Sequence, residues 1–467
     1  MKRRTFVETM TGMMAASALP ALSRQAMPAT EAPQRPPSPA TAPRFGDGRD
    51  WFFEKRFGLL VHWGLYAIPG WHEQHQWRAR VPRGEYAKLA AQWNPVKYDP
   101  DAWLDLAAET GMKYVCFTTK HHDGFCLWDT RQTSYNTMNT PYGRDVLKML
   151  ADACHRRGFP LCLYYSCVDW HQPNYPNQGR HHELAGPLPG DQPDFGKYME
   201  FLKAQVRELC TNYGEIHGFW WDMNVPKHVD RSINDMIRRL QPKAVINNRG
   251  YDEGDFGTPE RDYEKDEGQP LRGRTEANQS VGSESWGYRR DEDYYTDRHL
   301  MRSIDKYLAR DANYLLNVGP TPEGTIAPEA AAILKRIGRW YHAVKESLEG
   351  VAPASRYTIN RDVLLTRRDN ALYVHLFKEP TSAAVKLKPI RVAPRRATLL
   401  NTGAAVKFAV DLLPSEHVEH KPCLRLRMLP VNEMADTVLV VKLEFDQLPQ
   451  LPQPAQGKPE KNDLLRR

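Results

Sequence analysis

From Trp51 to about Gly350, short apolar runs alternate with longer segments of helical periodicity, and this alternation restricts the fold more than any other feature of the sequence. The apolar runs have the length of buried strands: Gly58–Leu65, Tyr114–Lys120, Leu161–Ser166, Gly218–Met223, Ala244–Arg249 and Tyr314–Gly319. The helical segments that accompany them include Asp101–Glu109, Asp145–Arg157, Tyr198–Tyr213, Ser232–Leu240 and Pro328–Val344. Strands that alternate with helices over about 300 residues predict a parallel sheet.

The length of this region suits a TIM-type (β/α)8-like barrel, whether regular or irregular. A doubly wound open sheet is the alternative, but no apolar run is followed by Gly-x-Gly-x-x-Gly. The pattern changes near Ala352, where short alternating segments are broken by Pro and Gly; examples are 371–377, 424–428 and 438–445. This second pattern predicts a C-terminal antiparallel β-sandwich.

The N-terminal segment predicts export. Lys2-Arg3-Arg4-Thr5-Phe6 is typical of a twin-arginine signal, and Met10–Leu22 is apolar but too short to span a bilayer. A chance Arg pair in a basic start is the alternative. We therefore expect a periplasmic or extracellular protein without a transmembrane segment. The predicted divisions are a signal peptide at 1–29, a Pro/Ala-rich linker at 30–49, a barrel at 50–350, a β-sandwich at 351–446 and a polar tail at 447–467.

The charge and the cysteines exclude several classes of protein. The chain has 64 basic and 57 acidic residues, and most of the excess lies at the termini and in the C-terminal third. The body holds no Lys/Arg-rich block with interleaved aromatics, so we expect no nucleic-acid partner. The seven cysteines are odd in number and scattered, which argues against a disulfide framework, and no Cys-x-x-Cys pair with a matching His indicates zinc.

Polar side chains occur where each apolar run ends. In a barrel of parallel strands these ends meet at one mouth, so the side chains should form a common site. The alternative is that strand ends become polar merely because they reach water, which explains one or two cases more easily than six. The residues concerned are His62, Lys120, His121, His122, Asp123, Tyr164, Tyr165, Asp222, Asn247, Asn248, Arg249 and Asn317.

Three of these residues have a specific chemical interpretation. His121 and His122 could ligate a metal, but no Asp, Glu or His partner has metal-ligand spacing, so we expect hydrogen bonding to sugar hydroxyls or a structural pair, and no cofactor. Asp222 ends an apolar run after Phe219-Trp220-Trp221, where a carboxylate is costly to bury without a function or an ionic partner. A structural ion pair is therefore the alternative to a catalytic carboxylate.

These segments resemble glycoside hydrolase family 29, the α-L-fucosidases. The resemblance covers Trp51 to Leu348 and rests on seven motifs in the same order and spacing: FGLLVHWGLYAIPGW, KYVCFTTKHHDGFCLWD, LCLYYSCVDW, GFWWDMN, INNR, SWGY and ANYLLNVGPTPEGTI. It implies a (β/α) barrel of imperfect eightfold form, a C-terminal β-sandwich and a retaining exo-α-L-fucosidase that forms a covalent fucosyl-enzyme intermediate. It also implies a fucosylated oligo- or polysaccharide as the substrate.

The resemblance assigns the site residues one by one. The family nucleophile matches Asp222, and the fucose-binding residues match His62, Trp77, His121, His122, Tyr164 and Arg249. The acid/base lies in a variable region that here contains Glu260, Glu264, Glu267, Glu276 and Glu284. Glu276 best fits the family position shortly before SWGY, so we assign it as the acid/base, with Glu260 and Glu284 as alternatives.

One departure from the family concerns the first loop. Many members have Glu-Trp-Tyr where this chain has Gln76-Trp77-Arg78, so a catalytic function for that Glu does not carry over. Arg78 could bind a sulfated or otherwise acidic glycan at the rim, or be a solvated surface residue. Two other functions stay open: a catalytically silent fucose-binding protein on the same fold, and a hydrolase of a related sugar such as galactose. The oligomeric state cannot be read from the sequence.

Overall fold

A computed structural model describes residues 44–261, 271, 273–414 and 420–449. Within them, seven strands form one sheet in the order β5-β4-β3-β2-β1-β7-β6, and every neighbouring pair is parallel. The strands are β1 (Phe57–Val61), β2 (Val115–Lys120), β3 (Leu161–Ser166), β4 (Gly218–Asp222), β5 (Val245–Ile246), β6 (Glu276–Ser280) and β7 (Asn313–Val318). All their residues are buried, which is why most of them read as unbroken apolar runs.

The gap between β5 and β6 is filled by an extended segment that is not a regular strand. Asn247 forms an isolated parallel bridge with Phe256, Gly257 with Thr275, and Glu260 with Asn278. Segment 256–260 thus lies between β5 and β6 and takes the place of an eighth strand. The expected irregular (β/α)8-like barrel is confirmed, and its irregularity places Glu260 on the barrel wall.

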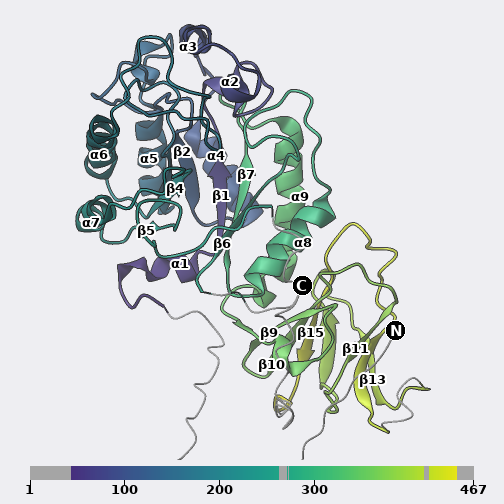
Figure 1. The fold of residues 1–467 in the computed structure, drawn as a ribbon. Helices are drawn as coiled ribbons and strands as arrows, with labels where there is room; N and C mark the ends of the chain where they lie inside the picture. The colour runs from purple at the N-terminus through teal and green to yellow at the C-terminus, as the bar shows by residue number, and fades with distance from the viewer. Residues whose placement is uncertain (1–43, 262–270, 272, 415–419, 450–467) are drawn as a thin grey trace, which may run out of the picture. The chain divides into compact units, whose positions relative to one another are not determined.

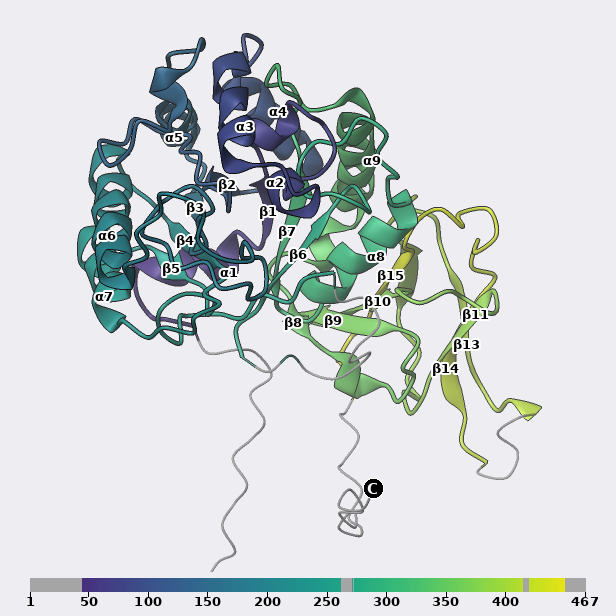
Figure 2. The same cartoon turned by 45° about the horizontal axis from the view of Figure 1, so that its top comes forward.

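The helices lie on the outer side of this sheet (Figure 1, Figure 2). The long ones are α4 (Pro100–Thr110), α5 (Val146–Arg157), α6 (Phe195–Asn212), α7 (Arg231–Leu240), α8 (Asp297–Leu308) and α9 (Pro328–Val344). Their ends follow the usual chemistry: the Asp99 and Asp145 side chains cap the first turns of α4 and α5, and left-handed Gly111 and Gly158 end these helices. Short helices α1 (Trp51–Glu54), α2 (His75–Arg78) and α3 (Arg83–Ala87) lie at the two ends of the strands.

Alternate strand residues belong to two separate cores, as the two-residue period of a strand requires. One set packs against the helices; it includes Leu59, Phe117, Leu163 and Leu316. The other set fills the barrel interior together with Phe52 of α1, Tyr114 and Phe256; its strand residues are Leu60, Cys116, Cys162, Tyr164, Trp220, Val245 and Leu315. The upper members of this interior set, Tyr164 and Trp220, form the floor of the cavity described below.

The C-terminal strands form two antiparallel sheets with a shared apolar core, which confirms the predicted β-sandwich. One sheet has the order β12-β15-β10-β9-β8 and the other β11-β14-β13. Their bounds are β8 (Ala352–Pro353), β9 (Leu364–Arg368), β10 (Ala371–His375), β11 (Ala384–Leu387), β12 (Arg396–Leu399), β13 (Lys407–Asp411), β14 (Cys423–Arg427) and β15 (Val440–Glu444). A hydrogen bond of 2.7 Å between buried His375 of β10 and Asp305 of α8 joins this sandwich to the barrel.

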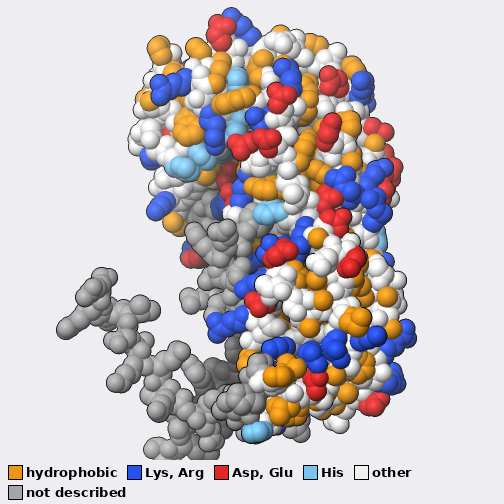
Figure 3. Space-filling model, turned by 90° about the vertical axis from the view of Figure 1, so that its right-hand side faces the viewer, with side chains coloured by type: hydrophobic (Ala, Val, Ile, Leu, Met, Phe, Trp, Pro, Cys, Tyr) orange, Lys and Arg blue, Asp and Glu red, His pale blue; other side chains and the backbone are white. Residues whose placement is uncertain are grey.

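The sequence also led to expectations about the terminal segments, membrane-spanning helices, cysteines and surface charge. The predicted signal peptide, most of the linker and nearly all of the tail lie outside the described residues. None of the helices in the described ranges combines the length and the apolar character that crossing a membrane requires. All seven cysteines lie in those ranges and are buried. On the face in Figure 3, acidic and basic side chains are interspersed with apolar ones.

Candidate active site

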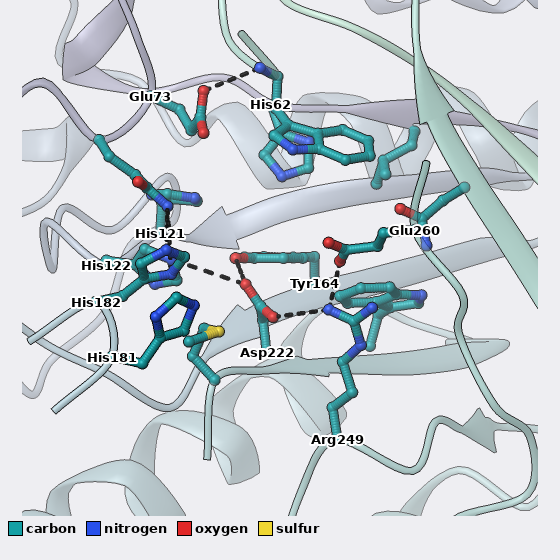
Figure 4. A pocket seen from close by; sticks show the side chains of 16 residues that line it. His62, Glu73, His121, His122, Tyr164, His181, His182, Asp222, Arg249 and Glu260 are labelled. Atoms are coloured by element: carbon teal, nitrogen blue, oxygen red, sulfur yellow. Dashed lines mark hydrogen bonds and ion pairs between the residues drawn. The ribbon is translucent and has the colours of Figure 1, made fainter. Parts of the chain in front are cut away.

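A cavity of about 280 Å³ opens at the carboxyl ends of the barrel strands. Six residues expected from the sequence line it together (Figure 4): His62, His121, His122, Tyr164, Asp222 and Arg249. They come from the ends of β1 to β5, so half of the strand-end residues expected at one mouth meet there. The other six do not line the cavity: Lys120, Asp123, Tyr165, Asn247, Asn248 and Asn317. Ten further residues complete the wall: Leu60, Glu73, Gln74, His181, His182, Trp220, Met223, Glu260, Asn278 and Trp286.

Asp222 lies at the centre of this cavity. The Tyr164 hydroxyl donates a hydrogen bond of 2.6 Å to its Oδ2, and an Arg249 guanidinium nitrogen lies 3.3 Å from its Oδ1. The His122 ring nitrogen Nε2 is 3.8 Å from Oδ2. Burial acts to raise the pKa of Asp222, but His122, Arg249 and Tyr164 outweigh it and hold this pKa below its usual value of 3.8. Asp222 is therefore an ionised carboxylate at neutral pH.

Glu260 shares the same guanidinium. The Arg249 nitrogen that contacts Asp222 also donates a hydrogen bond to a Glu260 carboxylate oxygen. Because one atom contacts both, the two carboxyl groups have oxygens within about 6 Å of each other, whereas inverting glycosidases need about 6.5–9.5 Å between their carboxyl groups and retaining ones about 5–5.5 Å. Burial and the charge of Asp222 raise the pKa of Glu260 above its usual value of 4.5, while Arg249 opposes them.

Arg249 is itself fixed in place. Its Nε donates 2.5 Å to the Thr258 hydroxyl, a second nitrogen donates 2.6 Å to the Thr258 carbonyl, and its guanidinium lies 4.8 Å from the centre of the Trp220 ring. The Trp220 ring in turn stacks on Tyr164 at 5.5 Å. Trp220 therefore packs against both Arg249 and Tyr164, two side chains that contact Asp222.

Two histidines offer hydrogen-bond acceptors to a ligand. Burial lowers the pKa of His122 to about 4, against the effect of Asp222, and burial also lowers the pKa of His62. The Ser166 hydroxyl lies 2.6 Å from His122 Nδ1 and donates to the Val168 carbonyl, so Nδ1 of His122 carries the proton.

The same reasoning applies to His62. Its Nδ1 lies 2.8 Å from the amide oxygen of Asn317, whose amide nitrogen donates to Ser280 Oγ and to the Trp286 carbonyl. Nδ1 of His62 therefore carries the proton as well. In both neutral rings Nε2 is left as an acceptor, which suits the hydroxyl groups of a sugar.

Glu73 is a site residue that the sequence did not reveal. The carboxylate missing at Gln76 is supplied three residues earlier, because Glu73 lines the cavity while Gln76 does not. Glu73 Oε2 accepts hydrogen bonds of 2.9 Å from both the Ser285 hydroxyl and the Trp286 backbone N–H. It thereby holds the Trp286 ring at the cavity wall, 5.4 Å from the ring of His62.

Of the residues assigned through the family resemblance, Glu276, Glu284 and Trp77 do not line the cavity, whereas Glu260, the alternative acid/base, does. Glu276 lies on β6 in the barrel interior, where its carboxylate accepts hydrogen bonds of 2.6 Å from the Tyr114 hydroxyl and 3.1 Å from the Trp220 indole. Burial raises the pKa of Glu276 to about 7, yet its contacts are with these side chains beneath the cavity floor. Glu284 is exposed, and Trp77 lines a neighbouring cavity instead. Glu264 and Glu267 lie outside the described residues.

A buried ion pair lies next to His121 and His122 in the chain. Lys120, which ends β2 just before His121, lies 2.7 Å from Asp169, and neither side chain is more than 2% exposed. Asp169 also accepts hydrogen bonds from the backbone N–H groups of His171 and Gln172. The pair therefore ties the end of β2 to the loop that follows β3, and that loop carries His181 and His182.

Replacing Lys120 with methionine is expected to lower the free energy of unfolding by about 3–5 kcal/mol, because it leaves the Asp169 charge buried without its partner. The control is Lys88→Met, whose pair with Glu85 is more than half exposed and should be worth less than about 1 kcal/mol. Urea denaturation of both variants measures the difference. Equal losses in the two variants would contradict this account of the ion pair.

No group of three or more His, Cys, Asp or Glu side chains that could hold a metal ion occurs in the described ranges. The chemistry that the arrangement supports is instead that of two carboxyl groups. Asp222 is ionised, and the pKa of Glu260 is raised, so the pair has the opposite protonation tendencies that a nucleophile and a general acid require.

Comparisons with known proteins point to one family. A family model described as alpha-L-fucosidase matches residues 31–346. The tissue α-L-fucosidase of Homo sapiens is 26% identical over 397 residues, which cover 77% of this chain and 82% of the human protein.

Two solved structures that resemble this one are also α-L-fucosidases. α-L-Fucosidase isoenzyme 1 from Paenibacillus thiaminolyticus has a TM-score of 0.75 and 33% identity, covering 86% of this chain and 99% of its own. A family 29 α-L-fucosidase from Bacteroides thetaiotaomicron has a TM-score of 0.71 and 27% identity, covering 87% of this chain and 99% of its own. Its structure is that of a trapped covalent intermediate in complex with 2-fluoro-fucosyl fluoride.

Proposed function

Because the chain belongs to the α-L-fucosidase family of glycoside hydrolases, we propose that it removes terminal α-L-fucose from glycans by a retaining mechanism. In this proposal Asp222 is the nucleophile and Glu260 is the acid/base. The observation that carries it is the single Arg249 nitrogen shared by the two carboxyl groups, which keeps their nearest oxygens within about 6 Å, closer than the carboxyl groups of inverting enzymes.

In the first step, an oxygen of Asp222 attacks C1 of the fucose ring from the side opposite the leaving oxygen. The C1–O bond breaks, and the proton of Glu260 moves to the departing oxygen, so that the rest of the glycan leaves as an alcohol. The lowered pKa of Asp222 keeps the nucleophile ionised, and the raised pKa of Glu260 favours a proton on the acid.

In the second step, water attacks C1 of the fucosyl ester while Glu260, now a carboxylate, takes a proton from it. The bond between C1 and Asp222 breaks, and α-L-fucose leaves with its original configuration. Arg249 stays beside Asp222 throughout and stabilises the carboxylate as it is released.

The cavity suits one terminal sugar. Its volume of about 280 Å³ lies below the usual range of about 300–1,000 Å³ for small-molecule sites, which favours exo action on a single ring. The Nε2 atoms of His62 and His122 would accept hydrogen bonds from sugar hydroxyls. Leu60, Trp220 and Trp286 supply apolar surface, which fits a sugar whose C6 is a methyl group rather than a hydroxymethyl group.

A further part of the proposal concerns organisation and location. We assign catalysis to the domain at 50–350, which holds all the cavity residues, and treat 351–446 as a separate sandwich domain. We also propose export through the twin-arginine-like segment at 1–29. A silent fucose-binding protein would lack one of the two carboxyl groups, and both are present here, so hydrolysis is the better proposal.

The proposal is tested by an assay of p-nitrophenyl α-L-fucoside and p-nitrophenyl β-D-galactoside side by side. We expect turnover of the fucoside and at least about 100-fold less of the galactoside, since its C6 hydroxyl would meet the apolar wall without a partner. Proton NMR of the first product should show α-L-fucose before mutarotation. Faster turnover of the galactoside, or β-L-fucose as the first product, would contradict the proposal.

A further inference from the structure

A second and larger cavity of about 1090 Å³ lies next to the fucose cavity. Its walls come from segment 71–83, which includes α2 and the start of α3, and from loop 179–188 after β3. Figure 1 shows α2 and α3 beyond the same end of the sheet at which the strands deliver the site residues. Of its lining, the family resemblance assigns only Trp77, as a fucose-binding residue, and the proposed chemistry does not use this cavity.

The two cavities share a wall. Gln74 lines the fucose cavity, and its side-chain oxygen accepts a hydrogen bond of 2.9 Å from Nε of Arg78, which lines the larger cavity. The indole of Trp77 donates 2.7 Å to the Glu183 carbonyl and packs edge-on against His182, with ring centres 5.2 Å apart. The two linings therefore adjoin at Gln74 and Arg78 and at Trp77 and His182.

The lining of the larger cavity is strongly basic. Two of its arginines have acidic partners: Arg180 lies 2.7 Å from Glu183, and Arg83 lies 2.7 Å from Asp191. Glu183 is the single carboxylate in the lining. The arginines of this lining are Arg78, Arg80, Arg83 and Arg180.

Arg78 and Arg80 differ from the other two. Both are exposed, and neither forms an ion pair with any carboxylate of the residues that the structure describes. Guanidinium groups bind sulfate and carboxylate groups through paired hydrogen bonds. On the same rim, the ring of Trp71 is 43% exposed, which offers a flat surface for stacking a sugar.

We propose that this cavity binds the part of the substrate beyond the fucose, and that Arg78 and Arg80 recognise an anionic group on it. The proposal rests on the hydrolase function proposed above. The chemistry required is a sulfate ester or a carboxylate on the sugar that leaves, so the substrate class is an acidic fucosylated glycan. Trp71 provides the apolar contact, and the arginines provide the selectivity.

The test compares three fucosyl disaccharides and one aryl fucoside. The second sugar of the disaccharides carries a sulfate ester, a carboxylate or neither. The aryl fucoside, p-nitrophenyl α-L-fucoside, carries neither a sulfate ester nor a carboxylate. For the parent protein we expect kcat/KM to be at least about 10-fold higher on one or both anionic disaccharides than on the neutral one, as for a charge-assisted contact, and to fall with added NaCl.

Arg80→Ala should remove most of this preference and leave turnover of the aryl fucoside unchanged, because Arg80 makes no contact with the fucose cavity. Arg361→Ala, which removes an exposed charge from the sandwich, is the matched control and should change neither. A preference for the sulfated or for the carboxylated disaccharide identifies the natural anion.

The proposal is overturned if the parent shows no preference, or if Arg80→Ala lowers kcat/KM equally on neutral and anionic disaccharides. Failure of the hydrolase function itself would look different, because the parent would then not release nitrophenol from the aryl fucoside at all.

Discussion

Replacing Asp222 with glycine is expected to lower kcat on p-nitrophenyl α-L-fucoside by about 10⁴-fold or more, the size of effect seen when an enzyme loses its nucleophile. Without this carboxylate the fucosyl ester cannot form. Among the described residues, the other carboxylate that contacts Arg249 is that of Glu260, which the proposal uses as the acid/base. Stopped assays at saturating substrate measure the loss.

Azide provides the matched control for this variant. Removal of the Asp222 side chain leaves a space beside Arg249 and Tyr164 that a small anion can enter. Azide should then attack C1 from the side that Asp222 occupied, restore release of nitrophenol, and yield β-L-fucosyl azide. Because rescue requires an intact cavity, it separates loss of the nucleophile from loss of the fold. A variant that keeps a tenth of the parent activity without azide would contradict the assignment.

Replacing Glu260 with glutamine is expected to cost about 10²–10⁴-fold on a natural fucosylated glycan, the usual contribution of a general acid. The loss should be much smaller on substrates with acidic phenol leaving groups, because these depart without protonation. A plot of log kcat/KM against the pKa of the leaving phenol should therefore become steeper in Glu260→Gln than in the parent. An unchanged slope would contradict the assignment of Glu260.

The same carboxyl pair sets the dependence of kcat/KM on pH. Asp222 must be ionised and its pKa is lowered below 3.8, and His122, with a pKa of about 4, must be neutral, so the acid limb should lie at about pH 4 or below. Glu260 must be protonated, and its pKa is raised, so activity should fall only at a pH above 4.5. Glu260→Gln cannot titrate and should keep the acid limb while losing the alkaline one.

The other glutamates of the region serve as controls. Glu276→Gln keeps an acceptor for the Trp220 indole and should leave the leaving-group slope unchanged, and exposed Glu284→Gln should behave likewise. Glu264→Gln and Glu267→Gln test the two residues outside the described ranges. If either of these, rather than Glu260→Gln, steepens the slope, the acid/base is misplaced.

Strands made mostly of apolar residues could be predicted from the sequence, whereas a polar strand could not. The six apolar runs correspond to β1 to β5 and β7, and α9 has the predicted bounds, because strands buried on both faces and amphipathic helices leave strong patterns. β6, with the sequence EANQS, has no apolar residue except Ala277, so nothing in its pattern predicted a strand. Its polar side chains are satisfied inside the barrel, which only the three-dimensional contacts reveal.

That missed strand explains the assignment of Glu276 to acid/base catalysis. Spacing along the chain brought Glu276 close to SWGY, but its place on β6 turns the carboxylate toward Tyr114 and Trp220. Glu260 was named from the sequence only as an alternative, since its position depends on segment 256–260 filling the gap between β5 and β6. Residues at the ends of apolar strands, such as Asp222 and His62, were predictable because strand direction alone places them.

Glu73 illustrates a second limit. Gln76 occupies the position of a family glutamate, which suggested that the carboxylate was lost. Glu73, three residues earlier, instead lines the cavity. Its function depends on partners more than 200 residues away, Ser285 and the Trp286 backbone, which no local pattern connects to it.

Covalent trapping tests the central claim most directly. The protein is incubated with 2-fluoro-fucosyl fluoride, whose fluorine at C2 slows breakdown of the ester, and is then digested and analysed by tandem mass spectrometry. The mechanism predicts one fucosyl label per chain, on the peptide that contains Gly218–Asp222, with Asp222 as the modified residue. A label on another residue, or full inactivation without any label, would contradict it.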